Sequence, residues 1–207
     1  MRWRFFYLFI TLLFSGCAQL PTTESTAKRS WDIQKAQLEQ LTHWDFSGKL
    51  AFITPEERNS VNIHWQQSGQ NFHIYLSTFL GMRLLEIQKN DHETIIIDDD
   101  GKRYAANNGE QLITELSGMD IPIEQLQQWI KGNPSNASYQ LNAQQQVASL
   151  FGGKQKNDLW SITYSDYRTI KNINLPHKLQ LTRGGLRLKF SISNWQIKNA
   201  LLQNLED

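Results

Sequence analysis

Apolar and polar residues alternate along most of this chain from Phe46 onward, with a period of two. In the first such segment, Phe46, Leu50 and Phe52 are separated by polar or small residues. A period of two puts every second side chain on one face of an extended strand, so it predicts a half-buried β-strand. Turns such as Ser68-Gly69 separate the segments. We therefore predict a mainly β fold of ten or eleven short strands in a sequential antiparallel meander. Further segments lie at 61–66, 72–77, 84–87, 95–97, 139–141, 147–151, 160–164, 179–181 and 186–197.

A few segments have helical rather than strand spacing. In 110–116 and 122–130, apolar residues recur every three or four positions, and a glycine follows each segment. A further helix is predicted from Ser30 to about Trp44. Few helices and many strands favour one large curved sheet or barrel over a sandwich of two modules. Because a barrel of more than about eight strands leaves interior space that its own side chains do not fill, an apolar cavity is predicted.

The N-terminal residues have the three regions of an export signal. Two arginines precede an uncharged, mostly apolar run at 5–14, and two small residues precede Cys17. At about 1.5 Å per residue, this run is too short to cross a bilayer as a helix. We predict a signal peptide at 1–16, a lipid-bearing cysteine and flexible tether at 17–29, and a single folded domain at 30–207.

Cys17 is the only cysteine in the chain. A single thiol forms no internal disulfide, and it excludes zinc or iron–sulfur sites built from several thiolates. The sequence FSGC at 14–17 resembles the lipobox of bacterial lipoproteins, which implies that this cysteine carries acyl chains. Three chains, at about 0.8 kcal/mol for each buried CH₂, make such an anchor effectively permanent. By the same resemblance, Ala18 implies sorting to the outer membrane.

Charge and motifs argue against several function classes. With 21 basic and 20 acidic residues, the net charge of +1 does not favour nucleic acid. Since the chain has no nucleophile elbow, phosphate-binding loop or dinucleotide motif, we predict no catalytic residue and no cofactor. His64 and His73 fall on the polar faces of adjacent strands without a third ligand, which favours exposed histidines over a metal site. The run 98–101, DDDG, lacks the spacing of a calcium loop and favours an acidic hairpin turn.

One predicted turn, at 77–82, is unusually apolar. It contains Phe79, Leu80 and Gly81, whereas the tip of a hairpin is normally polar because it faces water. Two interpretations follow from the pattern. Either Phe79 and Leu80 fold back onto the domain, or they form a wedge that enters a membrane or a partner.

Several motifs taken together resemble one family. They are WQQSGQ at 65–70, Leu80-Gly81, GKRY at 101–104, LSGMDIPI at 116–123, QWIKG at 128–132 and NWQIK at 194–198. With these motifs the chain resembles the LolB family of outer-membrane lipoprotein receptors. Members of this family take lipoproteins from the periplasmic carrier LolA and insert them into the outer membrane.

The resemblance implies an unclosed antiparallel barrel covered by short helices, with a hydrophobic cavity for the acyl chains of a lipoprotein in transit. It implies a LolA-type carrier, these acyl chains and outer-membrane lipid as partners, and no nucleic acid. The protein would be a lipid-anchored monomer that faces the periplasm and uses no ATP, and the loop Phe79-Leu80-Gly81 would drive release into the membrane. From the alternation in the strands and the helical spacing of 122–130, we expect the cavity to be lined by Phe46, Leu50, Phe52, Ile63, Trp65, Ile74, Leu76, Trp129 and Ile162.

Two other function classes stay open at this point. A structural lipoprotein that only tethers an outer-membrane assembly needs no cavity, so a filled barrel interior would favour it. A lipid-processing enzyme needs a nucleophile and a base at the cavity mouth, which the scattered histidines do not provide.

Overall fold

The computed structural model describes residues 23–153 and 159–198, with side chains from residue 30 onward. The predicted signal peptide and Cys17 lie outside the described residues. The predictions for these segments therefore stay predictions.

Within the described residues, eleven strands form one antiparallel sheet that consists of two meanders. The first meander contains β1 (His43–Ile53), β2 (Arg58–Ser68), β3 (Asn71–Ser77), β4 (Arg83–Lys89), β5 (Thr94–Asp98) and β6 (Arg103–Ala106). The second contains β7 (Ser138–Leu141), β8 (Val147–Gly152), β9 (Trp160–Ile170), β10 (Ile173–Arg183) and β11 (Leu186–Ile197).

The first and last strands join the two meanders. β1 pairs with β11, so the order in the sheet is β6-β5-β4-β3-β2-β1-β11-β10-β9-β8-β7. Because β6 and β7 are the two edges, the barrel stays open between them. The predicted mainly β fold and the unclosed antiparallel barrel are confirmed. The single sequential meander is corrected to two, because a pairing between strands so far apart in sequence leaves no local pattern.

The junction depends on a close approach of the two backbones at Gly48. The register of β1 against β11 shifts between Ser47 and Gly48. A Cβ atom at Gly48 would overlap the main-chain oxygen of Ser191, so only glycine fits here.

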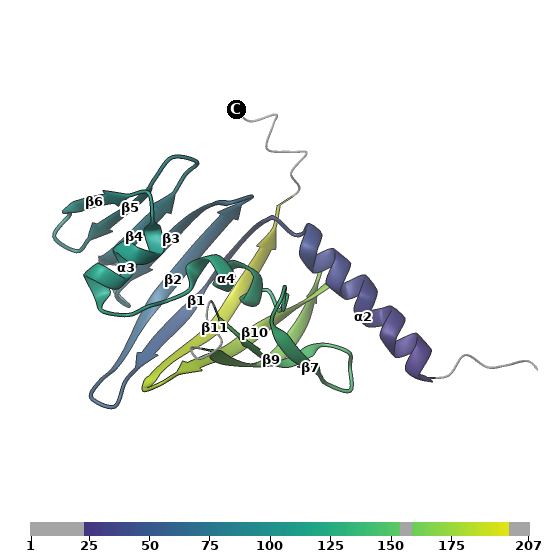
Figure 1. Ribbon diagram of the computed structural model, residues 1–207. Helices are drawn as coiled ribbons and strands as arrows, with labels where there is room; N and C mark the ends of the chain where they lie inside the picture. The colour runs from purple at the N-terminus through teal and green to yellow at the C-terminus, as the bar shows by residue number, and fades with distance from the viewer. Residues whose placement is uncertain (1–22, 154–158, 199–207) are drawn as a thin grey trace, which may run out of the picture.

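Three described helices complete the fold: α2 (Thr23–Gln40), α3 (Gly109–Ser117) and α4 (Ile123–Trp129). The chain crosses from the β6 edge to the β7 edge through α3 and α4, and Figure 1 shows both helices on the same face of the sheet. α2 begins earlier than predicted and ends four residues before Trp44, which is already in β1. The early start is possible because 22–40 contains neither proline nor glycine.

α2 packs against the second meander. As its spacing predicts, Trp31, Leu38 and Leu41 are buried. The Trp31 indole donates a hydrogen bond of 3.0 Å to the Tyr139 hydroxyl, and the Gln34 amide donates one of 2.8 Å to the main-chain oxygen of Asn174. The helix is therefore fixed to the sheet by both apolar and polar contacts.

An aromatic cluster on the inner face holds the centre of the sheet together. Trp44, Phe46 and Trp65 come from β1 and β2, and Trp195 comes from β11. The ring of Phe46 lies 5.1 Å from that of Trp195 and 6.0 Å from that of Trp65. Among the described residues, all the buried apolar side chains except that of Ile95 join into one core. The two meanders and the helices therefore share one hydrophobic core.

A buried lysine fastens the end of the crossing segment to this core. The Lys131 ammonium group donates a hydrogen bond of 2.7 Å to the main-chain oxygen of Leu41, and the residue is 1% exposed. Burial lowers the pKa of Lys131 to about 8, although the negative charge of Glu39 partly opposes this shift. The contact therefore holds the residues after α4 next to the start of β1. Removing the charged group from water is unfavourable, and the hydrogen bond offsets part of this free energy.

Candidate functional site

An apolar cavity of about 110 Å³ lies between the inner face of the sheet and the crossing segment. Strands β1 to β4 and β11 form one wall, and α3, α4 and the residues between them form the other. Ser117 is the only lining residue that is not apolar. The lining residues are Leu50, Phe52, Ile63, Trp65, Ile74, Leu76, Leu85, Ile87, Ile113, Ser117, Met119, Ile121, Ile123, Leu126, Leu188 and Phe190.

Most of the residues expected to line a cavity are brought together here, namely Leu50, Phe52, Ile63, Trp65, Ile74 and Leu76. Three others are not. Phe46 lies in the aromatic cluster, Ile162 is fully buried on β9, and Trp129 is buried against Gly152. Aromatic rings surround Phe46, and the end of α4 packs on the second meander, where the Tyr164 hydroxyl of β9 donates a hydrogen bond to the Trp129 main-chain oxygen.

Sequence reasoning missed the wall formed by the crossing segment. Ile113, Met119, Ile121, Ile123 and Leu126 all line the cavity. The helical spacing of Ile113, Ile123 and Leu126 was visible in the sequence, but it indicates only that one face of each helix is buried, and Met119 and Ile121 lie between the helices. Which part of the sheet that face covers depends on the path of the crossing segment.

α3 and α4 are linked to each other as well as to the sheet. The side chain of Asn108 accepts a hydrogen bond from the main-chain N–H of Gln111 and caps the start of α3. The buried Glu110 carboxylate accepts one of 3.0 Å from the main-chain N–H of Glu124 at the start of α4. Gly118 ends α3 in the left-handed conformation, with φ of 68°. The two helices therefore form one connected cover over the cavity.

A second contact ties this cover to the second meander, and we call it the clasp. Arg183, at the end of β10, donates hydrogen bonds of 2.8 Å to the Asp120 carboxylate and 2.6 Å to the Asp120 main-chain oxygen. The Arg183 guanidinium also lies over the Trp160 ring, 4.8 Å from its centre. The clasp therefore holds the segment between α3 and α4 against the sheet.

The turn between β3 and β4 exposes large apolar side chains. Phe79 is 86% exposed and Leu80 is 71% exposed, so they do not fold back onto the domain; Met82 is also exposed. We call Phe79, Leu80, Gly81 and Met82 the apolar tip. Hydrophobic side chains so exposed on a loop are typical of sites that meet an apolar surface.

Hydrogen bonds hold the apolar tip in a defined shape. The main-chain N–H of Gly81 donates to the Thr78 main-chain oxygen at 3.0 Å, and that of Met82 donates to the Thr78 hydroxyl at 3.2 Å. The Asn62 amide of β2 donates to the same Thr78 main-chain oxygen at 2.8 Å. Gly81 has a φ of 86°, which favours glycine. The tip is therefore preorganised, and little conformational entropy remains to be lost when it meets a partner.

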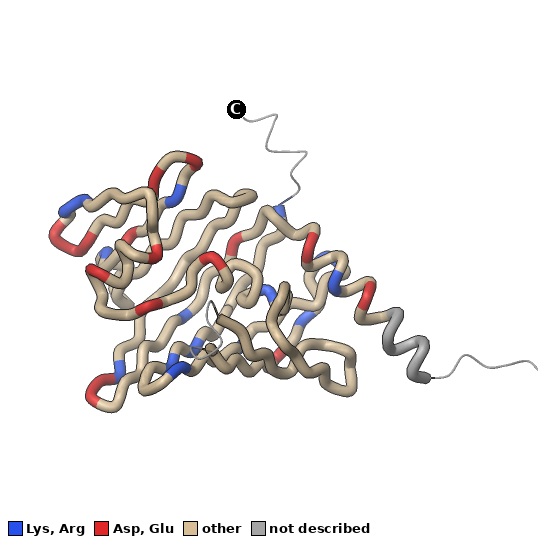
Figure 2. Tube along the Cα trace, in the orientation of Figure 1, with Lys and Arg blue, Asp and Glu red and all other residues tan. Residues whose placement is uncertain are grey.

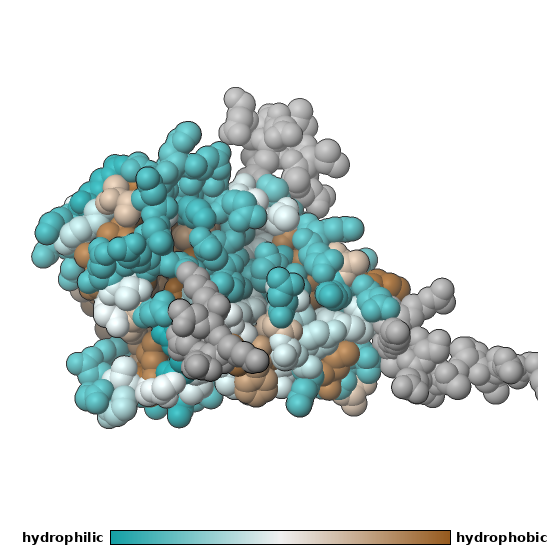
Figure 3. All heavy atoms as spheres, viewed as in Figure 1, coloured by the Kyte–Doolittle hydropathy of each residue, from teal (hydrophilic) through white to brown (hydrophobic). Residues whose placement is uncertain are grey.

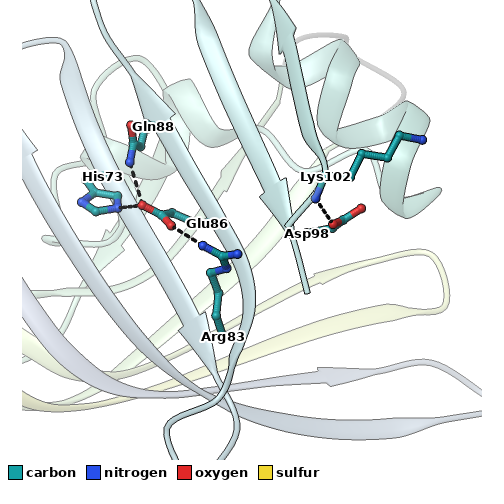
Figure 4. A network of polar contacts seen from close by, with 6 residues as sticks. All are labelled: His73, Arg83, Glu86, Gln88, Asp98 and Lys102. Carbon is teal, nitrogen blue, oxygen red and sulfur yellow. Dashed lines mark hydrogen bonds and ion pairs between the residues drawn. The ribbon is translucent and has the colours of Figure 1, made fainter. Parts of the chain in front are cut away.

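A polar network on the outer face supports the strands that carry the tip (Figure 4). Glu86 of β4 accepts hydrogen bonds from Gln88 at 2.6 Å and from Arg83 at 3.4 Å, and it lies 2.8 Å from His73 of β3. Burial alone raises the pKa of Glu86, but these hydrogen bonds and the charge of His73 outweigh it, so the pKa is lowered. The network therefore joins β3 to β4 through an ionised carboxylate.

The cavity and the apolar tip lie at the same end of the sheet. Leu76 and Leu85, which line the cavity, stand opposite each other just before and after the tip. On the face that carries the helices, hydrophilic residues dominate and hydrophobic ones show only in isolated places (Figure 3). The exposed apolar tip therefore lies next to an apolar cavity that the helices cover.

The other candidate residues have structural partners. His64 lies 3.8 Å from Asp45, and His73 is held by Glu86. Asp98 accepts a hydrogen bond of 2.8 Å from the main-chain N–H of Lys102 in the turn between β5 and β6 (Figure 4). In the part of the chain that the structure describes, no group of three or more His, Cys, Asp or Glu residues is placed to hold a metal ion.

Two further observations limit the choice of site. A hollow of about 470 Å³ beside α4 is larger than the cavity, but polar residues such as Gln125, Gln128 and Asn136 line much of it. It therefore does not offer an apolar ligand a continuous apolar wall. Among the described residues, no helix has the length and apolarity needed to cross a membrane.

The fold and the site define a class of protein: an open single-sheet barrel whose apolar cavity is covered by a helical crossing segment, with an apolar tip beside it. Solved structures of this fold include a putative outer-membrane lipoprotein-sorting protein domain from Vibrio parahaemolyticus. It has a TM-score of 0.58 and 9% identity, and the match covers 86% of this chain and 96% of that domain. A DUF1329 family protein from Desulfovibrio piger has a TM-score of 0.54, also at 9% identity, with 84% and 94% covered. At this identity the likeness shows the fold alone.

Comparison of the sequences identifies the family. The model of the family "Outer membrane lipoprotein LolB" matches residues 42–195. An outer-membrane lipoprotein LolB from Psychromonas ingrahamii is 51% identical over 191 residues, which cover 92% of this chain and 94% of the relative. The relative of the same name from Aeromonas hydrophila is 37% identical over 194 residues, covering 94% and 96%. The chain belongs to the LolB family. It is thus an outer-membrane lipoprotein that acts in lipoprotein localisation.

Proposed function

We propose that this protein accepts lipoproteins from a LolA-type periplasmic carrier and inserts them into the inner leaflet of the outer membrane without ATP. The observation that carries the proposal is the apolar cavity next to an exposed apolar tip at one end of the sheet. The cavity receives the acyl chains and the tip, Phe79-Leu80-Gly81 with Met82, contacts the membrane. The protein acts as a monomer, without catalytic residues or a cofactor.

The cover must move for this function. A cavity of roughly 150 Å³ takes up a molecule the size of benzene, so a space of about 110 Å³ is too small for an acyl chain. Because Glu110 links α3 to α4, the two helices move away from the sheet together once the clasp between Asp120 and Arg183 opens. The wall that they uncover is apolar.

A difference in hydrophobic burial drives each transfer step. Burying two more CH₂ groups than the carrier does, at about 0.8 kcal/mol each, gives roughly a tenfold preference for this cavity. The bilayer offers still better burial, so the chains move on when the tip brings the cavity to the membrane. Cys17 carries the lipid anchor, and residues 18–22 connect it to α2, so that the domain faces the periplasm.

Site-specific photocrosslinking tests the proposal. A photoreactive amino acid at Ile74, on the cavity wall, is compared with one at the neighbouring Tyr75, which points to the outer face. When a carrier loaded with lipoprotein is added without ATP, we expect the variant at position 74 to crosslink to the acyl chains and the variant at position 75 not to. A lipoprotein that only tethers an assembly gives no crosslink at either position, and that result would refute the proposal.

A further inference from the structure

The outer face of the sheet carries a group of basic side chains that lipoprotein transfer through the cavity does not use. We call Lys49, Arg58, Lys178, Arg187 and Lys189 the basic face, and all five are exposed. They come from β1, β2, β10 and β11. In Figure 2, blue segments gather on the lower parts of the central strands, whereas red segments are frequent on the hairpins of β4 to β6 and on the helices and also mark the hairpin between β1 and β2, which contains Glu56 and Glu57.

The register of the strands places these side chains close together on one side of the sheet. In one row, Lys49 and Lys178 stand on either side of Ser191 of β11. In a second row, Arg58 and Arg187 stand on either side of Ile53 of β1. Lys189 lies between these two rows. With strands about 5 Å apart and alternate residues about 7 Å apart, the basic face spans roughly 20 Å.

Most of these charges are not compensated. Among the described residues, Lys49, Arg58, Arg187 and Lys189 form no ion pair with a carboxylate. Lys178 lies 3.8 Å from Asp166, whose carboxylate is already paired with Arg168 at 2.9 Å. The basic face therefore has a positive potential that attracts anions.

A hollow of about 570 Å³ lies within the basic face. Its lining contains four of the five basic residues and no acidic residue. Hydroxyl groups of Ser60, Thr163, Ser165 and Ser191 lie among them. Ammonium, guanidinium and hydroxyl groups are all hydrogen-bond donors to phosphate oxygens, so this lining suits phosphate groups.

The basic face adjoins the apolar tip. Lys49 of β1 stands opposite Asn62 of β2, and Asn62 stands opposite Ser77, the last residue of β3 before the tip. In Figure 1 the hairpin between β1 and β2 lies at the lower left of the view and the N-terminal end of α2 at the lower right. Five residues, 18–22, lie between Cys17 and Thr23, so the two can be at most about 20 Å apart. The basic face and the tip can therefore meet one surface at the same time.

We propose that the basic face docks on the phosphate groups of anionic phospholipids in the bilayer, so that it orients the domain with its apolar tip toward the membrane. This proposal rests on the proposed function, because the basic face is given the role of turning the tip toward the membrane into which lipoproteins are inserted. A bilayer fits better than an acidic protein surface because the charges stand beside exposed Phe79 and Leu80. Basic residues beside inserted apolar ones are the combination that binds an anionic membrane surface.

Vesicle binding by residues 18–207, which keep the whole described fold but lack Cys17, tests this proposal. We expect tighter binding to vesicles of phosphatidylcholine with 30% phosphatidylglycerol, a fraction of about one third chosen to give a strong surface potential, than to pure phosphatidylcholine. Binding should weaken as salt is added. A basic residue near an anionic surface contributes about 1 kcal/mol, or about fivefold, so Lys49→Gln with Lys189→Gln should weaken binding about 25-fold. The matched control, Lys35→Gln with Lys171→Gln, removes two charges away from the basic face and should change binding less than about twofold.

Two outcomes would overturn the proposal. One is equal binding of the unchanged protein to both kinds of vesicle. The other is unchanged vesicle binding by the Lys49→Gln, Lys189→Gln variant. If this variant binds vesicles but does not receive lipoprotein from the carrier, the basic face docks an acidic protein instead of a membrane. Since vesicle binding requires neither carrier nor cargo, its failure is distinct from failure of the crosslinking test of the proposed function.

Discussion

The clasp between Asp120 and Arg183 predicts opposite changes in two measurable quantities. Asp120→Ala removes the 2.8 Å contact to the carboxylate and leaves the 2.6 Å contact to the main-chain oxygen. The Asp120 side chain is 53% exposed and that of Arg183 is 19% exposed, so solvent screening limits the pair to about 1 kcal/mol. Because the clasp exists only while the cover is closed, its loss makes opening easier by the same amount. The affinity for an acyl chain should therefore rise about fivefold, and the free energy of unfolding of the empty domain should fall by about 1 kcal/mol.

Titration with a fluorescent fatty acid measures the affinity, and urea unfolding measures the stability. Asp120→Asn is the control, because its amide oxygen still accepts a hydrogen bond, and both quantities should change by less than half as much. A loss of stability in Asp120→Ala without a gain in affinity would refute the reasoning, since it would mean that the cover does not need to leave the sheet when a chain binds.

Three further changes test other parts of the structure. Leu80→Glu should leave receipt of lipoprotein intact but slow its insertion into vesicles by about 5- to 30-fold, since the tip loses about 1–2 kcal/mol of apolar burial; Ile33→Glu, at another exposed aliphatic residue, on α2, should insert normally. Between pH 8 and 10.5 the unfolded chain binds more protons at Lys131 than the folded chain does, so the free energy of unfolding should rise with pH by up to about 3 kcal/mol; urea unfolding of Lys131→Met should lack this rise. Gly48→Ala should destabilise the domain by about 1–3 kcal/mol in the same assay, because the added carbon overlaps Ser191; an unchanged midpoint would show that β1 and β11 can separate freely.

The alternation of apolar residues predicted the strands well, because it reports which face of each strand is buried. Inward residues such as Ile63, Ile74 and Leu76 were therefore assigned to the interior correctly. The pairing of β1 with β11 could not be predicted in this way, since it joins residues as far apart as Trp44 and Ile197. The prediction that the barrel is open came from the family resemblance and not from the residue pattern.

The candidate site was predicted only in part, for a related reason. Alternation separates inside from outside, but it does not say which inside positions border empty space. Phe46 and Ile162 point inward like Leu50, yet neighbouring rings and the second meander fill the space around them. The apolar tip was easier to find, because Phe79 and Leu80 contradict the usual polarity of a turn.

The pairing of the first strand with the last has a consequence for how the chain acquires its fold. During synthesis the first meander can form early, but β1 has no partner on its second edge until Ile197 has appeared. Closing this contact brings together residues more than 140 positions apart, which is a slow step because so long a loop must be ordered first. Until then the half-formed sheet exposes Trp44 and Phe46 and an unpaired strand edge, the features that make a nascent chain prone to aggregate.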